Sequence, residues 1–96
     1  MSMDLIDQQT RGTEARMLLD NPIMKEALDA IEKEVFDQWM QCPARDKDGK
    51  EALWQLAKTA QKFRGILTGY IETGKLATEQ MKQFEERGTL RKLFGT

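Results

Sequence analysis

Apolar residues recur at steps of three and four along two long stretches of the chain, and a short segment containing Pro43 separates them. The two sets are Met24, Leu28, Ile31, Val35 and Trp39 in the first stretch and Leu53, Leu56, Ala60, Phe63, Leu67 and Tyr70 in the second. This spacing puts each set on one face of an α-helix, whereas a half-buried strand would show strict alternation. The sequence therefore predicts an all-α fold: a long antiparallel helical hairpin with short flanking N- and C-terminal helices.

The first long helix has local signals at both of its ends. Asn21 is a residue type that caps helices, and Pro22 has the fixed φ and the missing N–H that suit the first helical position. The residue before Pro43 is disfavoured in the α conformation, so the helix should end near Gln41. We therefore predict a helix over residues 22–41.

The second long helix is predicted over about residues 46–73. Asp46 or Asp48 can cap its start, and Gly74 is typical of a helix stop. The helix before the break is acidic and this one is basic, because residues 1–49 hold six basic and eleven acidic side chains, and the remainder holds nine basic and five acidic ones. We expect the acidic and basic helices to lie side by side in the hairpin.

Shorter elements are expected on either side of the hairpin. Thr13 begins a predicted helix over residues 13–19 as its cap, and Thr78 is the cap before another over residues 79–87. The segment before Thr13 lacks a sustained apolar period. The expected organisation is a flexible N-terminal arm over residues 1–12 and a single helical domain over residues 13–96.

Several kinds of chemistry are excluded by composition. The chain has no histidine and a single cysteine, so zinc sites of cysteine and histidine, Ser-His-Asp triads and Cys-His dyads cannot form within one chain. Residues 69–75 match a phosphate-binding loop, but Leu76 stands where a Ser or Thr must hold magnesium, and the pattern closes a helix. We predict no catalytic, cofactor-binding or metal site, and therefore no enzyme.

A calcium loop and a membrane span are also not expected. Asp46-Lys47-Asp48-Gly49 has the composition of a calcium loop, but the required glycine and bidentate glutamate are missing at the sixth and twelfth positions. The longest uninterrupted apolar run is only three residues long, far shorter than a span requires. The Asp-rich segment is better explained as a helix cap and turn.

The back of the second long helix is a candidate interaction surface. Lys58, Lys62, Gly65 and Gly69 follow one another at four, three and four residues, so they share one face. Each glycine inside a helix costs about 0.8 to 1 kcal/mol relative to alanine, which calls for an explanation. The glycines permit close approach of another backbone or of a nucleic-acid phosphate. The alternatives are a solvated face or a contact with the protein's own terminal helix.

Other candidate interaction residues are aromatic, basic or apolar. Trp54 lies beside Leu53, off the strict apolar face, so partial exposure and an interface role are expected. An apolar group near the C-terminus either covers the hairpin or docks on a partner. The complete set of candidates is Trp54, Lys58, Lys62, Arg64, Gly65, Gly69, Phe84, Leu90, Leu93 and Phe94.

A family resemblance covers about residues 11–77. Its residues are Ala15-Arg16-Met17-Leu18-Leu19-Asp20-Asn21-Pro22, Trp39, Pro43-Ala44-Arg45-Asp46, Gly49-Lys50-Glu51, Leu53-Trp54, Arg64-Gly65 and Glu72-Thr73-Gly74-Lys75-Leu76-Ala77. Over these residues the chain resembles a group of small tailed-bacteriophage proteins encoded among head and virion-assembly genes. The resemblance implies a viral setting and a helical form, with no catalytic or binding residues to carry over.

Three functional hypotheses, each from a different class, are compatible with the sequence. The leading hypothesis is a non-enzymatic phage structural or assembly protein that forms homo-oligomers or binds head, neck or scaffold proteins through its helix faces. The second is a nucleic-acid-binding packaging or regulatory factor, whose basic residues would be Lys58, Lys62, Arg64, Lys75, Arg87, Arg91 and Lys92. The third is an inhibitor of a host protein. The expected location is the host cytoplasm or the virion, with no membrane partner.

Overall fold

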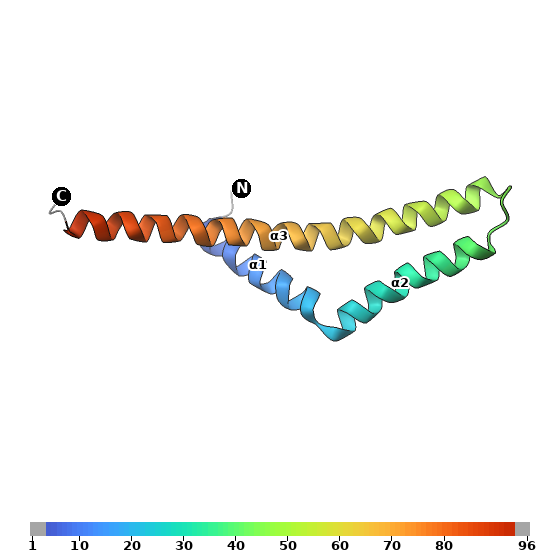
Figure 1. Cartoon of the computed structure of the whole chain (residues 1–96), viewed down its shortest axis with the longest axis horizontal. Helices are drawn as coiled ribbons and strands as arrows, with labels where there is room; N and C mark the ends of the chain where they lie inside the picture. Colours follow the sequence, from blue (N-terminus) through green and yellow to red (C-terminus); the bar gives the residue numbers. More distant parts are fainter. Residues whose placement is uncertain (1–3, 94–96) are drawn as a thin grey trace. The chain divides into compact units, whose positions relative to one another are not determined.

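The computed structural model describes residues 4–93, and their side chains as far as Gly88. It contains three α-helices, labelled in Figure 1: α1 (Leu5–Asp20), α2 (Pro22–Gln41) and α3 (Lys47–Leu93). No strand occurs among residues 4–93. The prediction of an all-α fold is therefore confirmed.

Helix α1 begins earlier than its sequence pattern indicates. The Asp4 carboxylate accepts a hydrogen bond of 2.8 Å from the Asp7 backbone N–H, as an N-cap does. The Thr13 hydroxyl donates to the Gln9 carbonyl oxygen at 3.1 Å, a bond made inside a helix and not at its start. The prediction of a flexible arm is therefore wrong from Leu5 onward, because a good cap and packing against α3 compensate for the missing apolar period.

Helix α2 has the bounds that its local signals predict. The Asn21 side chain accepts hydrogen bonds from the backbone N–H groups of Ile23 and Met24 at 2.9 and 3.3 Å. At the other end, the Cys42 N–H donates to the Trp39 carbonyl oxygen at 3.2 Å. The extended backbone of Cys42 before proline ends the helix there.

Helix α3 is much longer than predicted. Asp46 is its cap, since its carboxylate accepts the Gly49 N–H at 2.9 Å. The predicted stop at Gly74 and the cap at Thr78 are wrong, because α3 passes through both residues and the Thr78 hydroxyl donates to the Gly74 carbonyl oxygen at 3.0 Å. The short helix predicted over residues 79–87 is part of α3. A glycine stops a helix only where the backbone turns left-handed, and tertiary packing keeps Gly74 helical.

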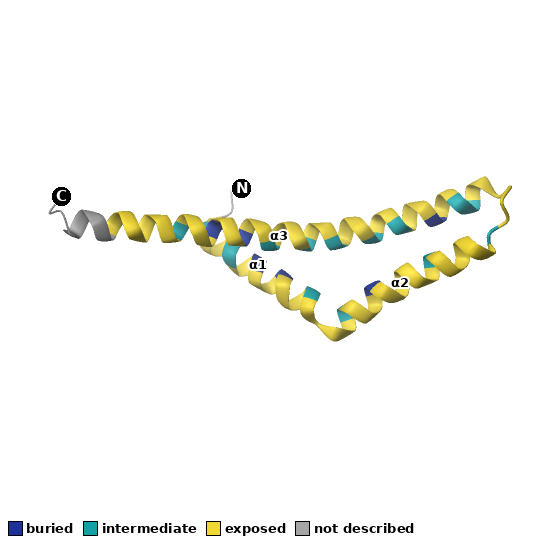
Figure 2. Cartoon of the chain, viewed as in Figure 1, coloured by how far each residue is buried: buried dark blue, intermediate teal, exposed yellow. Residues whose placement is uncertain are grey.

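The chain divides into two compact units, where the sequence predicted a single domain. Unit 1 consists of the residues up to Arg16 and from Leu67 onward, and unit 2 consists of Met17–Ile66. Helices α1 and α3 contribute to both units. Figure 2 shows how few residues of either unit are buried.

Unit 1 is held together by a close helix crossing at two glycines. A Cβ atom added to Gly12 would lie 2.8 Å from the Tyr70 carbonyl oxygen and 3.0 Å from the Gly74 Cα, so only glycine fits there. Ala15 and Ala77 are buried beside the crossing. Small residues thus let α1 and α3 approach closely.

Polar contacts surround the crossing in unit 1. The Gln9 side-chain amide donates a hydrogen bond of 3.0 Å to the Thr78 hydroxyl, and the Arg11 guanidinium lies 5.2 Å from the centre of the Tyr70 ring. The first turns of α1, blue in Figure 1, lie against the orange part of α3. Unit 1 therefore depends on close backbone packing and polar contacts more than on a large apolar core.

Unit 2 contains α2 and the first five turns of α3. Its buried apolar side chains are Leu28 and Leu53. The Arg64 guanidinium bonds the Glu32 carboxylate at 2.9 Å and lies 3.8 Å from that of Asp29. These contacts pack α2 against residues 47–66 of α3 around a small core.

Candidate interaction site

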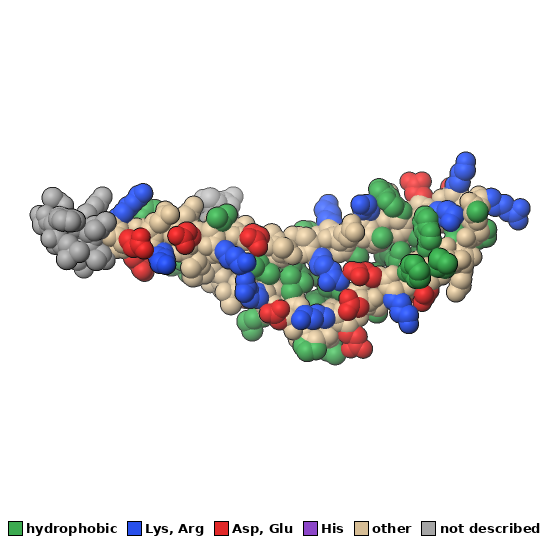
Figure 3. Space-filling model, viewed as in Figure 1, with side chains coloured by type: hydrophobic (Ala, Val, Ile, Leu, Met, Phe, Trp, Pro, Cys, Tyr) green, Lys and Arg blue, Asp and Glu red, His purple; other side chains and the backbone are tan. Residues whose placement is uncertain are grey.

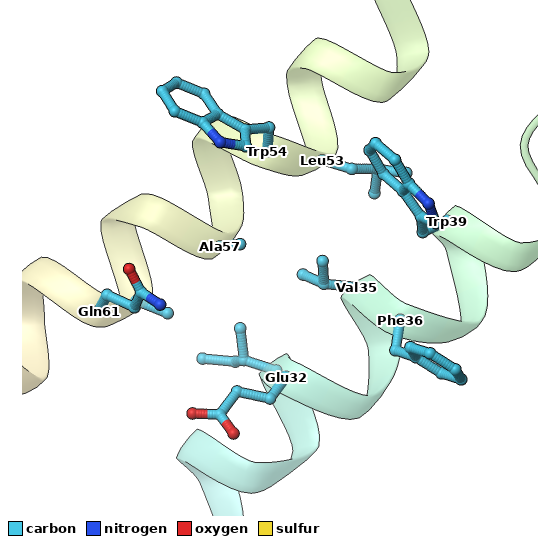
Figure 4. A pocket seen from close by; sticks show the side chains of 10 residues that line it. Glu32, Val35, Phe36, Trp39, Leu53, Trp54, Ala57 and Gln61 are labelled. Atoms are coloured by element: carbon cyan, nitrogen blue, oxygen red, sulfur yellow. The ribbon is translucent and has the colours of Figure 1, made fainter.

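A groove of about 330 Å³ lies between α2 and the start of α3 in unit 2 (Figure 4). Apolar side chains form most of its lining, and Glu32 and Gln61 are its polar members. The apolar lining consists of Ile31, Val35, Phe36, Trp39, Leu53, Trp54, Ala57 and Ala60. Its carboxylate, on Glu32, is bonded to Arg64, so the remaining surface of the groove is suited mainly to apolar contact.

Two aromatic rings stand at the rim of the groove. In Figure 4 the Val35 side chain points toward Ala57, whereas the rings of Phe36 and Trp54 point away from the space between the helices. Phe36 is 62% exposed and Trp54 is 52% exposed. Large rings left in solvent beside an apolar groove are typical of the anchors of protein interfaces.

Lysine side chains lie near the two tryptophan rings that line the groove. The Lys50 ammonium lies 4.3 Å from the centre of the Trp39 ring, and the Lys58 ammonium lies 5.6 Å from that of Trp54. Both distances allow cation–π attraction. The structure therefore brings together Trp54 and Lys58, two of the residues that the sequence singled out.

The remaining basic candidates differ in their surroundings. Arg64 is held by the carboxylates of α2, and Lys75 lies 3.5 Å from the Glu72 carboxylate in unit 1. Lys62 is exposed to solvent. Two of the cations proposed for nucleic-acid binding are thus already paired with acidic groups.

The two glycines on the back of α3 face open space. A Cβ atom added to Gly65 or Gly69 would meet nothing within 4 Å. The alternative that they contact the protein's own terminal helix is not seen among the described residues. Gly65 belongs to unit 2 and Gly69 to unit 1.

The C-terminal apolar candidates belong to unit 1 or lie outside the described part of the chain. Phe84 is exposed. The side chains of Leu90 and Leu93, and all of Phe94, fall outside the described residues. The prediction that this group docks on a partner stays a prediction.

Two features of the structure are not predicted by the sequence. One is the crossing at Gly12 and Gly74, whose signal is a glycine followed three residues later by a buried alanine in both helices. The other is the exposure of Phe36, which lies beside Val35 just as Trp54 lies beside Leu53. In both pairs the ring sits one position off the apolar face and therefore at the edge of the helix contact.

Among residues 4–93, no group of three acidic or cysteine side chains could hold a metal ion. No helix in the same range is long and apolar enough to cross a membrane. No protein-family model matches the chain, and neither a curated protein nor a solved structure is significantly similar to it.

Proposed function

We propose that the protein is a non-enzymatic structural or assembly protein that acts by packing its exposed helix faces against other protein subunits. The observation that carries this proposal is how few large apolar side chains unit 2 buries. Leu28 and Leu53 are the only two among its described residues. Helices that bury so little apolar surface by themselves commonly complete their cores by association.

The exposed surface includes many large apolar side chains. Most of them belong to unit 2, where Figure 3 shows hydrophobic side chains over α2 and the start of α3. They are Met17, Leu18, Ile23, Ile31, Phe36, Trp39, Met40, Trp54, Leu56, Phe63 and Ile66. Extended apolar patches on a folded chain mark interaction sites, which supports the proposal.

The arrangement that we propose for unit 2 is an antiparallel helical hairpin. Its support is the order of the contacts: Trp39, near the end of α2, meets Lys50, near the start of α3. Glu32, earlier in α2, meets Arg64, later in α3. This order is that of helices running in opposite directions, and it leaves two broad helix faces for partners.

Self-association tests the proposal. In sedimentation equilibrium the wild type should form an oligomer that dissociates on dilution, and Phe36→Glu and Trp54→Glu should each weaken it about 30-fold, as interface anchors do. Gln55→Glu is the matched control, because it adds the same charge at an exposed position of α3. A wild type that stays strictly monomeric up to millimolar concentration would contradict the proposal.

The setting that we propose is assembly of a tailed-phage particle, and its support is the sequence resemblance over residues 11–77. The protein should then occur in purified particles or in their assembly intermediates. Quantitative mass spectrometry should find it at a fixed ratio to the major head protein. Its absence from both mature particles and intermediates would exclude this setting without affecting the helix-face mechanism.

A further inference from the structure

Two lysines stand beside the groove of unit 2 without an acidic partner. The Lys50 ammonium lies 4.3 Å from the centre of the Trp39 ring, and the Lys58 ammonium lies 5.6 Å from that of Trp54. Both rings line the groove (Figure 4). Among the described residues, neither lysine forms an ion pair with a carboxylate. Two positive charges at the edge of the groove are therefore left for a partner.

The acidic residues of α2 do not face these lysines. Glu32 lines the groove and Asp29 lies one turn earlier, but the Arg64 guanidinium lies 2.9 and 3.8 Å from their carboxylates. At about 100° per residue, the other acidic residues of α2 lie about 130° or more from the middle of its groove-lining residues. They are Glu26, Glu34 and Asp37. Helix α2 is acidic as a whole, but its remaining carboxylates lie away from the groove.

The side of α3 that bears Trp54 is basic. Arg64 is left out here because it is bonded to α2. By the same angular count, the other charged residues of α3 within about 80° of Trp54 are four lysines and one glutamate. They are Lys47, Lys50, Glu51, Lys58 and Lys62. The charge beside the groove is therefore positive, which favours an acidic partner.

The groove has the length of about two helical turns. Its lining extends over residues 31–39 of α2 and 53–61 of α3, about 12 Å along each helix. A helix that fills an apolar groove presents apolar residues at i, i+3 or i+4 and i+7, which extend over about 10 Å. Lys50 and Lys58 are also about two turns apart, so acidic side chains with that spacing on a bound helix can reach both.

We propose that the groove binds an acidic amphipathic helix of a different protein. Apolar residues of that helix enter between α2 and α3, and its Asp or Glu side chains pair with Lys50 and Lys58. This inference rests on the proposed function and gives the chemical class of the partner subunit. The aliphatic side chains of Val35 and Leu53 favour a protein over a nucleic acid, because a base beside them would lose water from its polar edge without gaining hydrogen bonds.

Binding of designed peptides to the full chain tests the inference. The probe is a fluorescein-labelled peptide of about four turns, with leucine at i, i+4 and i+7 and glutamate on both sides of the leucines. One control peptide has lysine in place of every glutamate, and the other has the same composition in an order that leaves no apolar face. By fluorescence anisotropy, each control should bind at least about tenfold more weakly than the probe.

The peptide titrations use protein dilute enough to be monomeric. Phe36 and Trp54 line the groove and are also the anchors of the proposed self-association, so a second copy would compete with the probe. Excess probe should for the same reason shift a concentrated sample toward the monomer in sedimentation.

Lys58→Glu tests the contact with the lysines. It should weaken binding of the probe about tenfold and strengthen binding of the lysine peptide by a similar factor. Lys82→Glu is the matched control, since it makes the same change at an exposed position of unit 1 and should leave both affinities unchanged. Circular dichroism checks that both variants remain helical. Equal binding of the probe by the wild type and Lys58→Glu would overturn the proposed contact.

The outcomes separate this inference from the proposed function. A wild type that self-associates but binds the probe no better than the two control peptides overturns the inference alone. An oligothymidylate of about 15 nucleotides that displaces the probe and binds more tightly overturns it in favour of a nucleic acid. A wild type that binds the probe but stays monomeric at every concentration upholds the groove partner and contradicts the proposed self-association.

Discussion

Leu53→Ala should remove a large part of the stability of the protein, about 2 to 5 kcal/mol of the free energy of unfolding. Leu53 is 8% exposed and Leu28 is 4% exposed, and no other large apolar side chain is buried among the described residues. A chain of this length has a total stability of only about 5 to 14 kcal/mol. Because unit 2 buries so few large apolar side chains, truncating one of them should leave this unit close to unfolding.

Leu56→Ala is the matched control for this substitution. It removes the same atoms three residues further along α3, where the side chain is 45% exposed. The free energy of unfolding that it removes should therefore be well below half of the loss for Leu53→Ala. Urea denaturation followed by circular dichroism measures both, at one fixed protein concentration because association stabilises the folded state. Equal losses for the two variants would show that Leu53 is not the core residue of unit 2.

Gly12→Ala should destabilise unit 1, although the same substitution usually stabilises a helix. In an isolated helix, alanine would be better than glycine by about 0.8 to 1 kcal/mol. Here the new Cβ would lie 2.8 Å from the Tyr70 carbonyl oxygen, and a backbone atom cannot move aside without separating the helices. The expected net loss is about 1 to 3 kcal/mol, as for other overpacked sites.

Gly69→Ala should have the opposite sign and is the control for Gly12→Ala. Gly69 lies in the same unit, and a Cβ atom there meets nothing within 4 Å, so the helix should gain about 0.8 to 1 kcal/mol. Thermal denaturation compares the two variants, and hydrogen exchange of residues 5–16 reports directly on the crossing. A gain in stability for both variants would mean that α1 does not cross α3 at Gly12.

The sequence predicted those features whose causes lie within a few residues. Helix α2 has its expected bounds because its cap at Asn21 and its break at Pro43 act on their immediate neighbours. The partial exposure of Trp54 was expected for a similar reason, since its position beside Leu53 fixes its direction from the helix. The identity of Asp46 as the cap of α3 was one of two alternatives that local chemistry allowed.

The features that the sequence did not predict depend on residues far apart in the chain. Gly74 has the same local surroundings whether it stops a helix or packs inside one, and Gly12, some 60 positions earlier, decides between the two. Thr13 and Thr78 are equally ambiguous, because a threonine hydroxyl bonds either a free N–H at a cap or a carbonyl within a helix. The groove likewise requires the relative position of two helices, which apolar spacing alone does not define.

The division into two units has a consequence for the order in which the nascent chain folds. Unit 2 is a contiguous segment, so all of its residues have emerged from the ribosome once Ile66 has cleared the exit tunnel. Unit 1 joins the two ends of the chain, and its crossing must wait until Gly74 and Ala77 are made. The groove of unit 2 is therefore expected to form while synthesis continues, before the residues of the crossing in unit 1 have all emerged.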